Sequence, residues 1–259
     1  MDYITSKENT IIKETKKLKE KRYREERKQF LAEGVRFVSE ALESGFEISM
    51  VFISQDSGIK PVQFPIKAHT KVYCLPGNLF KDISFTENPQ GIAAVVNYSS
   101  LTVNREHGFY ILADRVQDPG NLGTIIRSAH ASGALGVIIT KGTVDVYNDK
   151  TLRATMGSIF HLPVIMDDGL VYLKALKAKG FKLVVSSLDA QNSFFEEDLK
   201  GNIIIAVGNE GAGISSSIAE LSDVRVKIPM PGGAESLNVS AAASIMMFEV
   251  LRQKIIDNK

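Results

Sequence analysis

Three loops of this 259-residue chain contain the residues best suited to chemistry, and each loop follows a predicted strand. Residues 115–127 form the first loop, R-V-Q-D-P-G-N-L-G-T-I-I-R, with Asn121 at a predicted helix start and Arg127 six residues later. At 1.5 Å per residue, the two positions lie about 9 Å apart along the helix. An Arg side chain can largely close that distance by reaching back toward the strand ends. The alternative is that Arg127 is an ordinary surface residue.

The second loop, G-N-E-G-A-G-I-S at residues 208–215, follows the strongly apolar segment Ile203–Val207. Its glycines allow backbone N–H groups to meet a ligand at the start of a helix. The spacing is not G-x-G-x-x-G and no G-K-[ST] follows, which argues against a dinucleotide fingerprint and against a P-loop. Glu210 would repel a phosphate but can accept hydrogen bonds from an amino or hydroxyl group.

The third loop lies within residues 226–240, V-K-I-P-M-P-G-G-A-E-S-L-N-V-S. Its prolines remove backbone donors and end the strand, and its glycines permit torsions closed to other residues. Ser236 or Asn238 can cap a helix that runs to about residue 254. A strand, turn and helix without chemistry would explain the prolines and the cap, but not the crowding of polar side chains at one helix start.

From residue 109 onward, predicted strands and predicted helices alternate along the chain, and the three loops connect them. This alternation predicts a largely parallel sheet covered on both faces, with ligand loops beyond the carboxyl ends of its strands. Strands are predicted at Phe109–Asp114, Leu135–Thr140, Leu162–Asp167, Phe181–Ser187, Asn202–Val207 and Val224–Pro229. Helices are predicted at about 121–132, 149–158, 170–179, 214–221 and 236–254.

The N-terminal part predicts a separate small α/β unit. Residues 7–28 carry ten Lys and Arg against five Glu, which fits either a basic helix face for RNA or a solvated helix with internal salt bridges. An amphipathic helix is predicted at Phe30–Gly45, strands at Ile48–Ser54, Lys71–Cys74 and Ile92–Asn97, and a short helix at Leu79–Phe85. The expected domains are therefore 1–98 and 107–259, joined by a polar linker at 99–106.

Composition narrows the class of protein further. The chain is 44% hydrophobic with a net charge of +1, so it can bury a sizeable core and any basic footprint must be local. Cys74 is the only cysteine, which excludes an internal disulfide and a thiolate metal cluster. The four histidines lack ligand spacing, so no metal is expected. Without a signal core or an eighteen-residue apolar run, the sequence predicts a soluble, cytoplasmic protein.

Taken together, the three loops resemble the motifs of the SpoU/TrmH branch of the SPOUT RNA methyltransferases. The matching segments, in order and correctly spaced, are D-P-G-N-L-G-T-I-I-R, V-G-N-E-G-A-G-I-S and I-P-M-P-G-G-A-E-S-L-N-V-S-A-A-A-S. Residues 20–97, with E-G-V-R-F-V-S-E-A-L, more loosely resemble the RNA substrate-binding domain of many members. The resemblance implies S-adenosylmethionine as cofactor, a ribose 2′-hydroxyl of RNA as acceptor, a homodimer and a C-terminal trefoil knot. Periodicity alone predicts an open sheet, since threaded chains are rare.

The resemblance also implies roles for single residues. Five polar residues match the family's active-site positions: Asn121, Arg127, Glu210, Ser236 and Asn238. Three residues match positions that line the cofactor pocket: Gly208, Ile228 and Leu237. Three more, at other strand ends, are further cofactor candidates: Thr140, Ser187 and Leu188.

These residues favour an RNA (ribose-2′-O-) methyltransferase, with ribosomal RNA preferred over transfer RNA because of the N-terminal resemblance. A guanidinium is a poor base, so Arg127 is expected to grip an RNA phosphate and orient the hydroxyl. We expect Asn121, Ser236 and Asn238 to shape the ribose site and Glu210 to hold its loop. The alternatives are a transfer-RNA methyltransferase, a non-catalytic RNA-binding or ribosome-assembly factor, and an oxidoreductase on an open sheet.

Overall fold

The structure, a computed structural model, describes residues 1–257, which form two compact units. Unit 1 comprises Met1–Ser100 and Tyr147–Phe160, and unit 2 comprises Leu101–Val146 and the chain from His161 onward. Residues 147–160 were expected in the second domain, but the structure packs them with the first. The chain therefore passes between the units three times.

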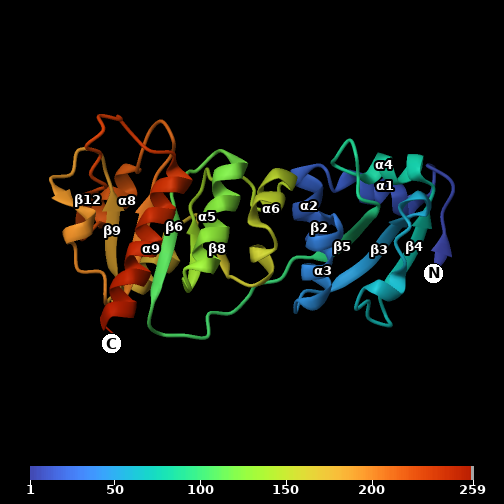
Figure 1. Ribbon diagram of the computed structural model, residues 1–259, viewed down its shortest axis with the longest axis horizontal. Coiled ribbons are helices and arrows are strands. Elements are labelled where there is room, and N and C mark those ends of the chain that lie inside the picture. The colour runs from blue at the N-terminus through green and yellow to red at the C-terminus, as the bar shows by residue number, and fades with distance from the viewer. Residues whose placement is uncertain (258–259) are drawn as a thin grey trace. The chain divides into compact units, whose positions relative to one another are not determined.

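Unit 1 is built on a mixed five-stranded sheet in the order β1-β4-β3-β5-β2 (Figure 1). The pairs β1–β4 and β3–β4 are parallel, whereas β5 runs antiparallel to β3 and β2. Its strands are β1 (Asp2–Tyr3), β2 (Gln29–Glu33), β3 (Ile48–Ser54), β4 (Lys71–Leu75) and β5 (Ile92–Asn97). Its α-helices are α1 (Thr10–Lys17), α2 (Lys21–Arg27), α3 (Val35–Glu43), α4 (Gly77–Ile83) and α6 (Asp149–Thr155). Short 3₁₀ turns follow at η1 (Gln55–Ser57), η2 (Pro61–Gln63) and η3 (Ser158–Phe160).

The helix predicted at Phe30–Gly45 is wrong in its first third. Residues 29–33 form β2, the chain turns at Gly34 with a φ of 96°, and only then does α3 begin. Phe30, Leu31 and Ala32 are all buried, so this short run shows no alternation by which a strand could be recognised. Pairing with β5, sixty or more residues away in the sequence, is what makes it a strand.

The basic segment 7–28 is two helices, not one. Arg24 is buried, and its guanidinium donates to the carbonyls of Leu18 at 2.8 Å and Lys19 at 2.9 Å, which closes the end of α1. Several of the other cations pair with carboxylates, among them Lys13 with Glu8, Lys17 and Arg27 with Glu14, and Lys21 with Glu25. The internal salt bridges of the second interpretation are therefore present.

Unit 2 contains a seven-stranded sheet in which every pairing is parallel, in the order β10-β12-β9-β11-β6-β7-β8. This confirms the predicted α/β class with a mostly parallel sheet. Its strands are β6 (Phe109–Ala113), β7 (Gly136–Ile139), β8 (Val164–Met166), β9 (Lys182–Ser186), β10 (Asn192–Ser193), β11 (Ile203–Val207) and β12 (Val224–Lys227). Of these, only β10 was not predicted, because it has two residues.

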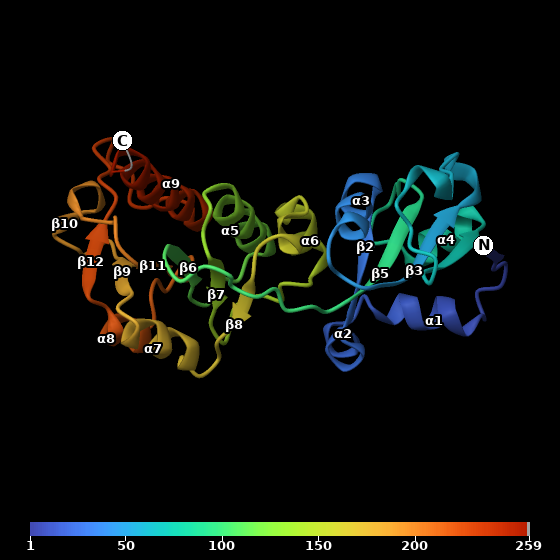
Figure 2. The same cartoon turned by 90° about the horizontal axis from the view of Figure 1, so that it is seen from below.

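Helices cover both faces of this sheet. In Figure 2, α5 (Pro119–Ala131) and α9 (Val239–Asp257) lie on one face, and α7 (Val171–Ala178) and α8 (Ser216–Leu221) lie on the other. The turn η4 (Phe194–Glu196) lies between β10 and β11. Apolar side chains of α7 and α8, such as Leu173 and Ile218, pack on Leu112 and Leu183 of the central strands. No helix within residues 1–257 has the length and apolar character needed to cross a membrane.

The strand order brings the three loops together. Strands β12, β9, β11 and β6 are consecutive in the sheet and parallel, so the segments that follow them lie at one edge. The helix α5 begins at Pro119, two residues before the predicted start, because the Asp118 carboxylate accepts from the backbone N–H of Asn121 at 2.8 Å.

Candidate active site

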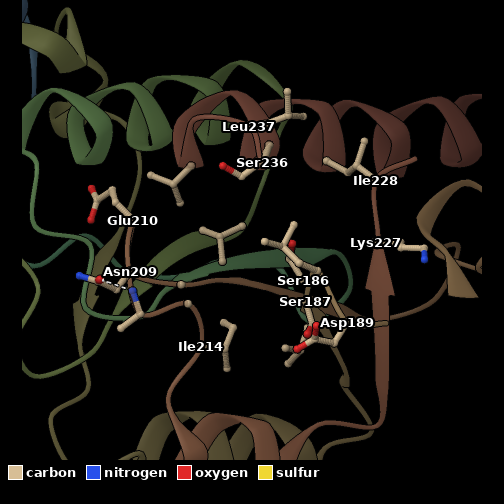
Figure 3. A pocket seen from close by; sticks show the side chains of 18 of the residues that line it. Ser186, Ser187, Asp189, Asn209, Glu210, Ile214, Lys227, Ile228, Ser236 and Leu237 are labelled. Atoms are coloured by element: carbon tan, nitrogen blue, oxygen red, sulfur yellow. Dashed lines mark hydrogen bonds between the residues drawn. The ribbon is translucent and has the colours of Figure 1, made fainter. Parts of the chain in front are cut away.

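A cavity of about 600 Å³ opens at the carboxyl edge of the unit 2 sheet (Figure 3). Its walls are mainly residues 185–189 at the end of β9 and beyond, residues 207–214 at the end of β11 and beyond, and residues 236–239 at the start of α9. Apolar side chains such as Ile214, Ile228 and Leu237 alternate with polar groups around it. This size and mixed lining are typical of a pocket for a cofactor or small ligand.

The glycine-rich segment from Gly208 to Ser215, here called the second-motif loop, closes on itself. Asn209 and Gly213 exchange two backbone hydrogen bonds of 3.0 and 2.9 Å, and the Asn209 side chain accepts from Gly211 and Ala212. A Cβ at Gly208 would lie 2.2 Å from the Gly213 carbonyl carbon, so only glycine permits this closure.

Glu210 in this loop joins it to the start of α5. Its carboxylate accepts from the backbone N–H groups of Gln117 at 3.2 Å and Asp118 at 3.1 Å, and from the Asn121 side-chain amide at 3.0 Å. Partial burial raises the pKa of the Glu210 carboxyl, but hydrogen bonds, that from Asn121 foremost, outweigh it and hold the pKa below its usual range. The carboxylate is therefore charged near neutral pH and acts as an anchor for its loop.

The same network continues to the start of α9. Because Asn121 donates its amide to a carboxylate, its Oδ1 points the other way and accepts from Asn238 Nδ2 at 2.9 Å. The Asn238 Oδ1 then accepts from the backbone N–H of Ser240 at 2.9 Å and from the Ser240 hydroxyl at 2.6 Å. One chain of hydrogen bonds thus links all three motif loops, from Glu210 through Asn121 to Asn238.

Arg127 and Ser236 complete the five predicted active-site residues, and both are exposed. Arg127 lies on α5 outside the cavity wall and, within residues 1–257, makes no hydrogen bond or ion pair. Ser236 lines the cavity together with Glu210 and Asn238, as Figure 3 shows for Ser236 and Glu210. The structure thus joins Asn121, Glu210 and Asn238 directly and leaves the Arg127 guanidinium free.

Five of the six predicted cofactor residues line the cavity: Gly208, Ile228, Leu237, Ser187 and Leu188. Thr140 does not. It is buried, and its hydroxyl donates to Asp114 at 2.8 Å. In the sequence, Thr140 follows a strand just as Ser187 and Gly208 do. In the sheet, however, β6 lies between β7 and the strands whose ends line the cavity.

Sequence reasoning missed several residues of the site. Asn209, Asp189 and Met230 line the cavity, and the buried Asp114 contacts the second-motif loop. Asp114 ends one predicted strand and Asn209 lies two residues beyond another, and these positions at strand ends were the available signal. Among the described residues, no three His, Cys, Asp or Glu side chains are arranged to hold a metal ion.

Two family models match the chain in separate segments. The SpoU rRNA Methylase family model matches residues 108–248, and the MRM3-like substrate binding domain matches residues 9–94. Together they cover the three motif loops and most of the N-terminal sheet.

Relatives match over nearly the whole chain. The 23S rRNA (guanosine(2553)-2′-O)-methyltransferase RlmP of Bacillus subtilis is 36% identical over 96% of this chain and 99% of its own length. The crystal structure of an AdoMet-bound rRNA methyltransferase from Sinorhizobium meliloti is similar with a TM-score of 0.87 and 32% identity, covering 96% of this chain and 97% of that one. The AdoMet complex of the SpoU methyltransferase AviRb from Streptomyces viridochromogenes also has a TM-score of 0.87, with 29% identity over 95% and 98% of the two chains. The chain therefore belongs to the SpoU rRNA methylase family.

Proposed function

We propose that this protein transfers a methyl group from S-adenosylmethionine to a ribose 2′-hydroxyl of ribosomal RNA. The observation that carries the proposal is the cavity whose wall is held by the chain of hydrogen bonds through Glu210, Asn121 and Asn238. A family of RNA methylases with these motifs in this order supports the same reaction.

The residues around the cavity fit S-adenosylmethionine. Ile214, Ile228 and Leu237 offer apolar surface to an adenine ring, and Asp189 with the backbone groups of Gly208 offers hydrogen-bond partners. When bound, the cofactor supplies a methyl group on a sulfonium, which is already activated for transfer. The protein must then mainly align the ribose oxygen with that methyl group and manage one proton.

We assign alignment to the polar groups near the cavity. The free, exposed guanidinium of Arg127 is suited to grip an RNA phosphate in bidentate fashion. A guanidinium is too poor a base to take the proton of a ribose hydroxyl, so Arg127 does not serve as the base. Asn238 and Ser236 face the cavity and would orient the ribose, while Glu210, which already accepts three hydrogen bonds, holds its loop.

Ribosomal RNA is the preferred substrate class, because the relatives that match over most of the chain are named 23S rRNA methyltransferases. The match of residues 9–94 to a substrate-binding domain supports RNA contact by an N-terminal domain at 1–98. We propose that a linker at 99–106 joins it to the catalytic domain at 107–259, of which residues 147–160 belong to unit 1 by their packing. The exposed Lys16 and Arg22 carry no ion pair in the described residues, so they are our candidates for phosphate contacts.

A trefoil knot is also proposed. The chain leaves β12 next to the sheet edge, yet α9 returns to pack on α5, β6 and β11 near the sheet centre. A C-terminal segment threaded through the second-motif loop and its neighbours would account for this return.

We further propose a homodimer that works in the cytoplasm. Four large apolar side chains of α9 remain substantially exposed, from Ile245 at 38% and Phe248 at 47% to Ile255 at 50% and Ile256 at 57%. They share one helix face, which a second copy would cover. The free, buried Cys74 fits a reducing compartment.

Incubation with radiolabelled S-adenosylmethionine and total RNA from a strain lacking the protein tests the function. Label confined to a ribose of ribosomal RNA is the expected result, and nuclease mapping gives the nucleotide. Label in transfer RNA would show that the substrate is transfer RNA and not ribosomal RNA. Cofactor binding without label on naked RNA or ribosomal particles would favour a non-catalytic RNA-binding factor.

A further inference from the structure

Asp114 is a buried carboxylate at the end of β6, with 1% of its surface exposed. Its Oδ1 accepts from the Thr140 hydroxyl at 2.8 Å, and its Oδ2 accepts from the backbone N–H of Ser215 at 2.6 Å. Thr140 follows β7, and Ser215 is the last residue of the second-motif loop. One side chain therefore ties together three segments that are distant in sequence.

The other end of the second-motif loop is held through the same group. Thr140 Oγ1, already donating to Asp114, accepts from the backbone N–H of Arg115 at 3.1 Å. Arg115 has a left-handed φ of 56°, and its carbonyl accepts from Asn209 Nδ2 at 2.9 Å. Asp114 thus contacts the loop directly at Ser215 and through two intermediates at Asn209.

This arrangement bears on the cavity, because residues 208–214 form one of its walls and Glu210 lies between the two tied ends. Asp114 itself does not line the cavity. We infer that Asp114 is a positioning residue for S-adenosylmethionine, acting through Thr140 and Ser215 to fix the loop that forms the wall. The identity of the ligand rests on the function proposed above.

The chemistry of the contact predicts which replacement should be tolerated. Ser215 N–H needs an acceptor, whereas the Thr140 hydroxyl can rotate and either donate or accept. Asparagine at position 114 can accept from Ser215 with its oxygen and donate to Thr140 with its amide. Asp114→Asn should therefore retain most of the cofactor affinity. Asp114→Ala should not, because it leaves the part-buried Ser215 N–H and the buried Thr140 hydroxyl without their acceptor.

The chain offers a matched control in Asp167, which is 5% exposed and follows β8 in the same sheet. Its carboxylate accepts from the backbone N–H groups of Tyr172 at 3.1 Å and Leu173 at 2.8 Å at the start of α7, away from the cavity. Asp167→Ala should cost comparable stability without touching the second-motif loop.

Calorimetric titration with S-adenosylmethionine and thermal unfolding of the full chain make the comparison. We expect Asp114→Ala to raise the Kd by about tenfold or more, Asp114→Asn and Asp167→Ala by less than about threefold, and Thr140→Val to fall between them. Equal Kd values for Asp114→Ala and Asp167→Ala at similar Tm would overturn the assignment. If Asp114→Ala does not fold, Thr140→Val against Asp167→Ala decides.

Hydrogen exchange of the ligand-free variants separates this inference from the proposed function. Asp114→Ala or Thr140→Val should speed exchange of the Gly211 and Gly213 amides, and Asp167→Ala should speed only amides near Tyr172. Unchanged exchange at residues 209–213 would reject the positioning role. A wild-type protein that does not bind S-adenosylmethionine would instead reject the proposed function, while the exchange result still decides the role of Asp114 in the loop.

Discussion

Two loops that meet at the cavity differ sharply in how they are held. The second-motif loop, Gly208–Ser215, is tied by Asp114, Arg115 and Asn121 as well as by its own backbone. The segment from Pro229 to Leu237, here called the third-motif loop, precedes the link between Asn238 and Asn121 and has one backbone hydrogen bond of its own, from Gly233 N–H to the Met230 carbonyl at 3.2 Å.

The third-motif loop is also the more exposed of the two loops. Every residue from 231 to 238 is exposed, although Ser236 and Leu237 line the cavity. A loop that is already held in place loses little conformational entropy when a ligand binds. A loop that is not held must be ordered on binding, which costs conformational entropy. One wall of the cavity is therefore preformed, and the other is expected to depend on the ligand for its order.

The largest expected effect comes from a change that leaves both loops intact. Arg127→Ala removes an exposed side chain on α5 that contacts neither loop, so Tm and the Kd for S-adenosylmethionine should stay near wild type. The turnover number should fall by about 10²-fold or more, because the ribose hydroxyl loses a group that aligns it with the methyl donor. Methyl-transfer kinetics with the identified RNA measure it.

Arg127→Lys sharpens that test. The lysine keeps the positive charge but cannot donate two parallel hydrogen bonds to one phosphate, so partial activity is expected. Near-normal turnover of Arg127→Ala would remove this residue from the mechanism.

The second-largest effect is expected from a substitution that disrupts the second-motif loop. Gly208→Ala places a Cβ within 2.4 Å of the Gly213 carbonyl and the Ile214 nitrogen, which forces the loop apart. We expect a loss of about 1–3 kcal/mol in unfolding free energy and a rise in the cofactor Kd of about tenfold or more. Gly232→Ala in the third-motif loop is the control, because nothing lies within 4 Å of its added Cβ. Equal effects of the two substitutions would erase the difference between the loops.

A smaller effect is expected in the third-motif loop. Leu237 is 38% exposed, so Leu237→Ala should hardly change Tm, yet it should raise the Kd for S-adenosylmethionine by about fivefold through lost apolar contact. Val171→Ala, an exposed apolar residue of α7 away from the cavity, should change neither quantity. Titration calorimetry and thermal melts give both values. A large fall in Tm for Leu237→Ala would mean that this loop is already packed.

The smallest predicted effect is a pH dependence at Glu210. Its folded pKa lies below the unfolded value of about 4.3, so its carboxylate adds stability above that pH, and this stability is lost as the pH falls through the folded pKa. The difference in Tm between wild type and Glu210→Gln should therefore be constant from pH 6 to 8, as rough limits, and shrink below about pH 4. Thermal melts across this range measure it, and a gap that persists in acid would place the effect of Glu210 elsewhere than in its charge.

The sequence determined the parallel sheet of unit 2 and the order of its three motif loops. Strands such as β6 and β11 are continuous apolar runs bounded by glycine and proline turns, so local pattern suffices to find them. The cavity wall was predictable as well, because Gly208, Ile228 and Leu237 lie in those loops.

Tertiary structure decided what depends on residues far apart in the chain. Phe30 lies in a strand because β5 pairs with it, and Phe30 also stacks on Tyr147, whose segment packs with unit 1 and not with its sequence neighbours. Thr140 and Asp114 look alike in the sequence, as polar residues at strand ends. Only the order of the sheet shows that they form a hydrogen bond with each other and that Asp114 also accepts one from Ser215 of the second-motif loop. Periodicity records which face of an element is buried, whereas the partner that buries it is chosen by the packing of the whole unit.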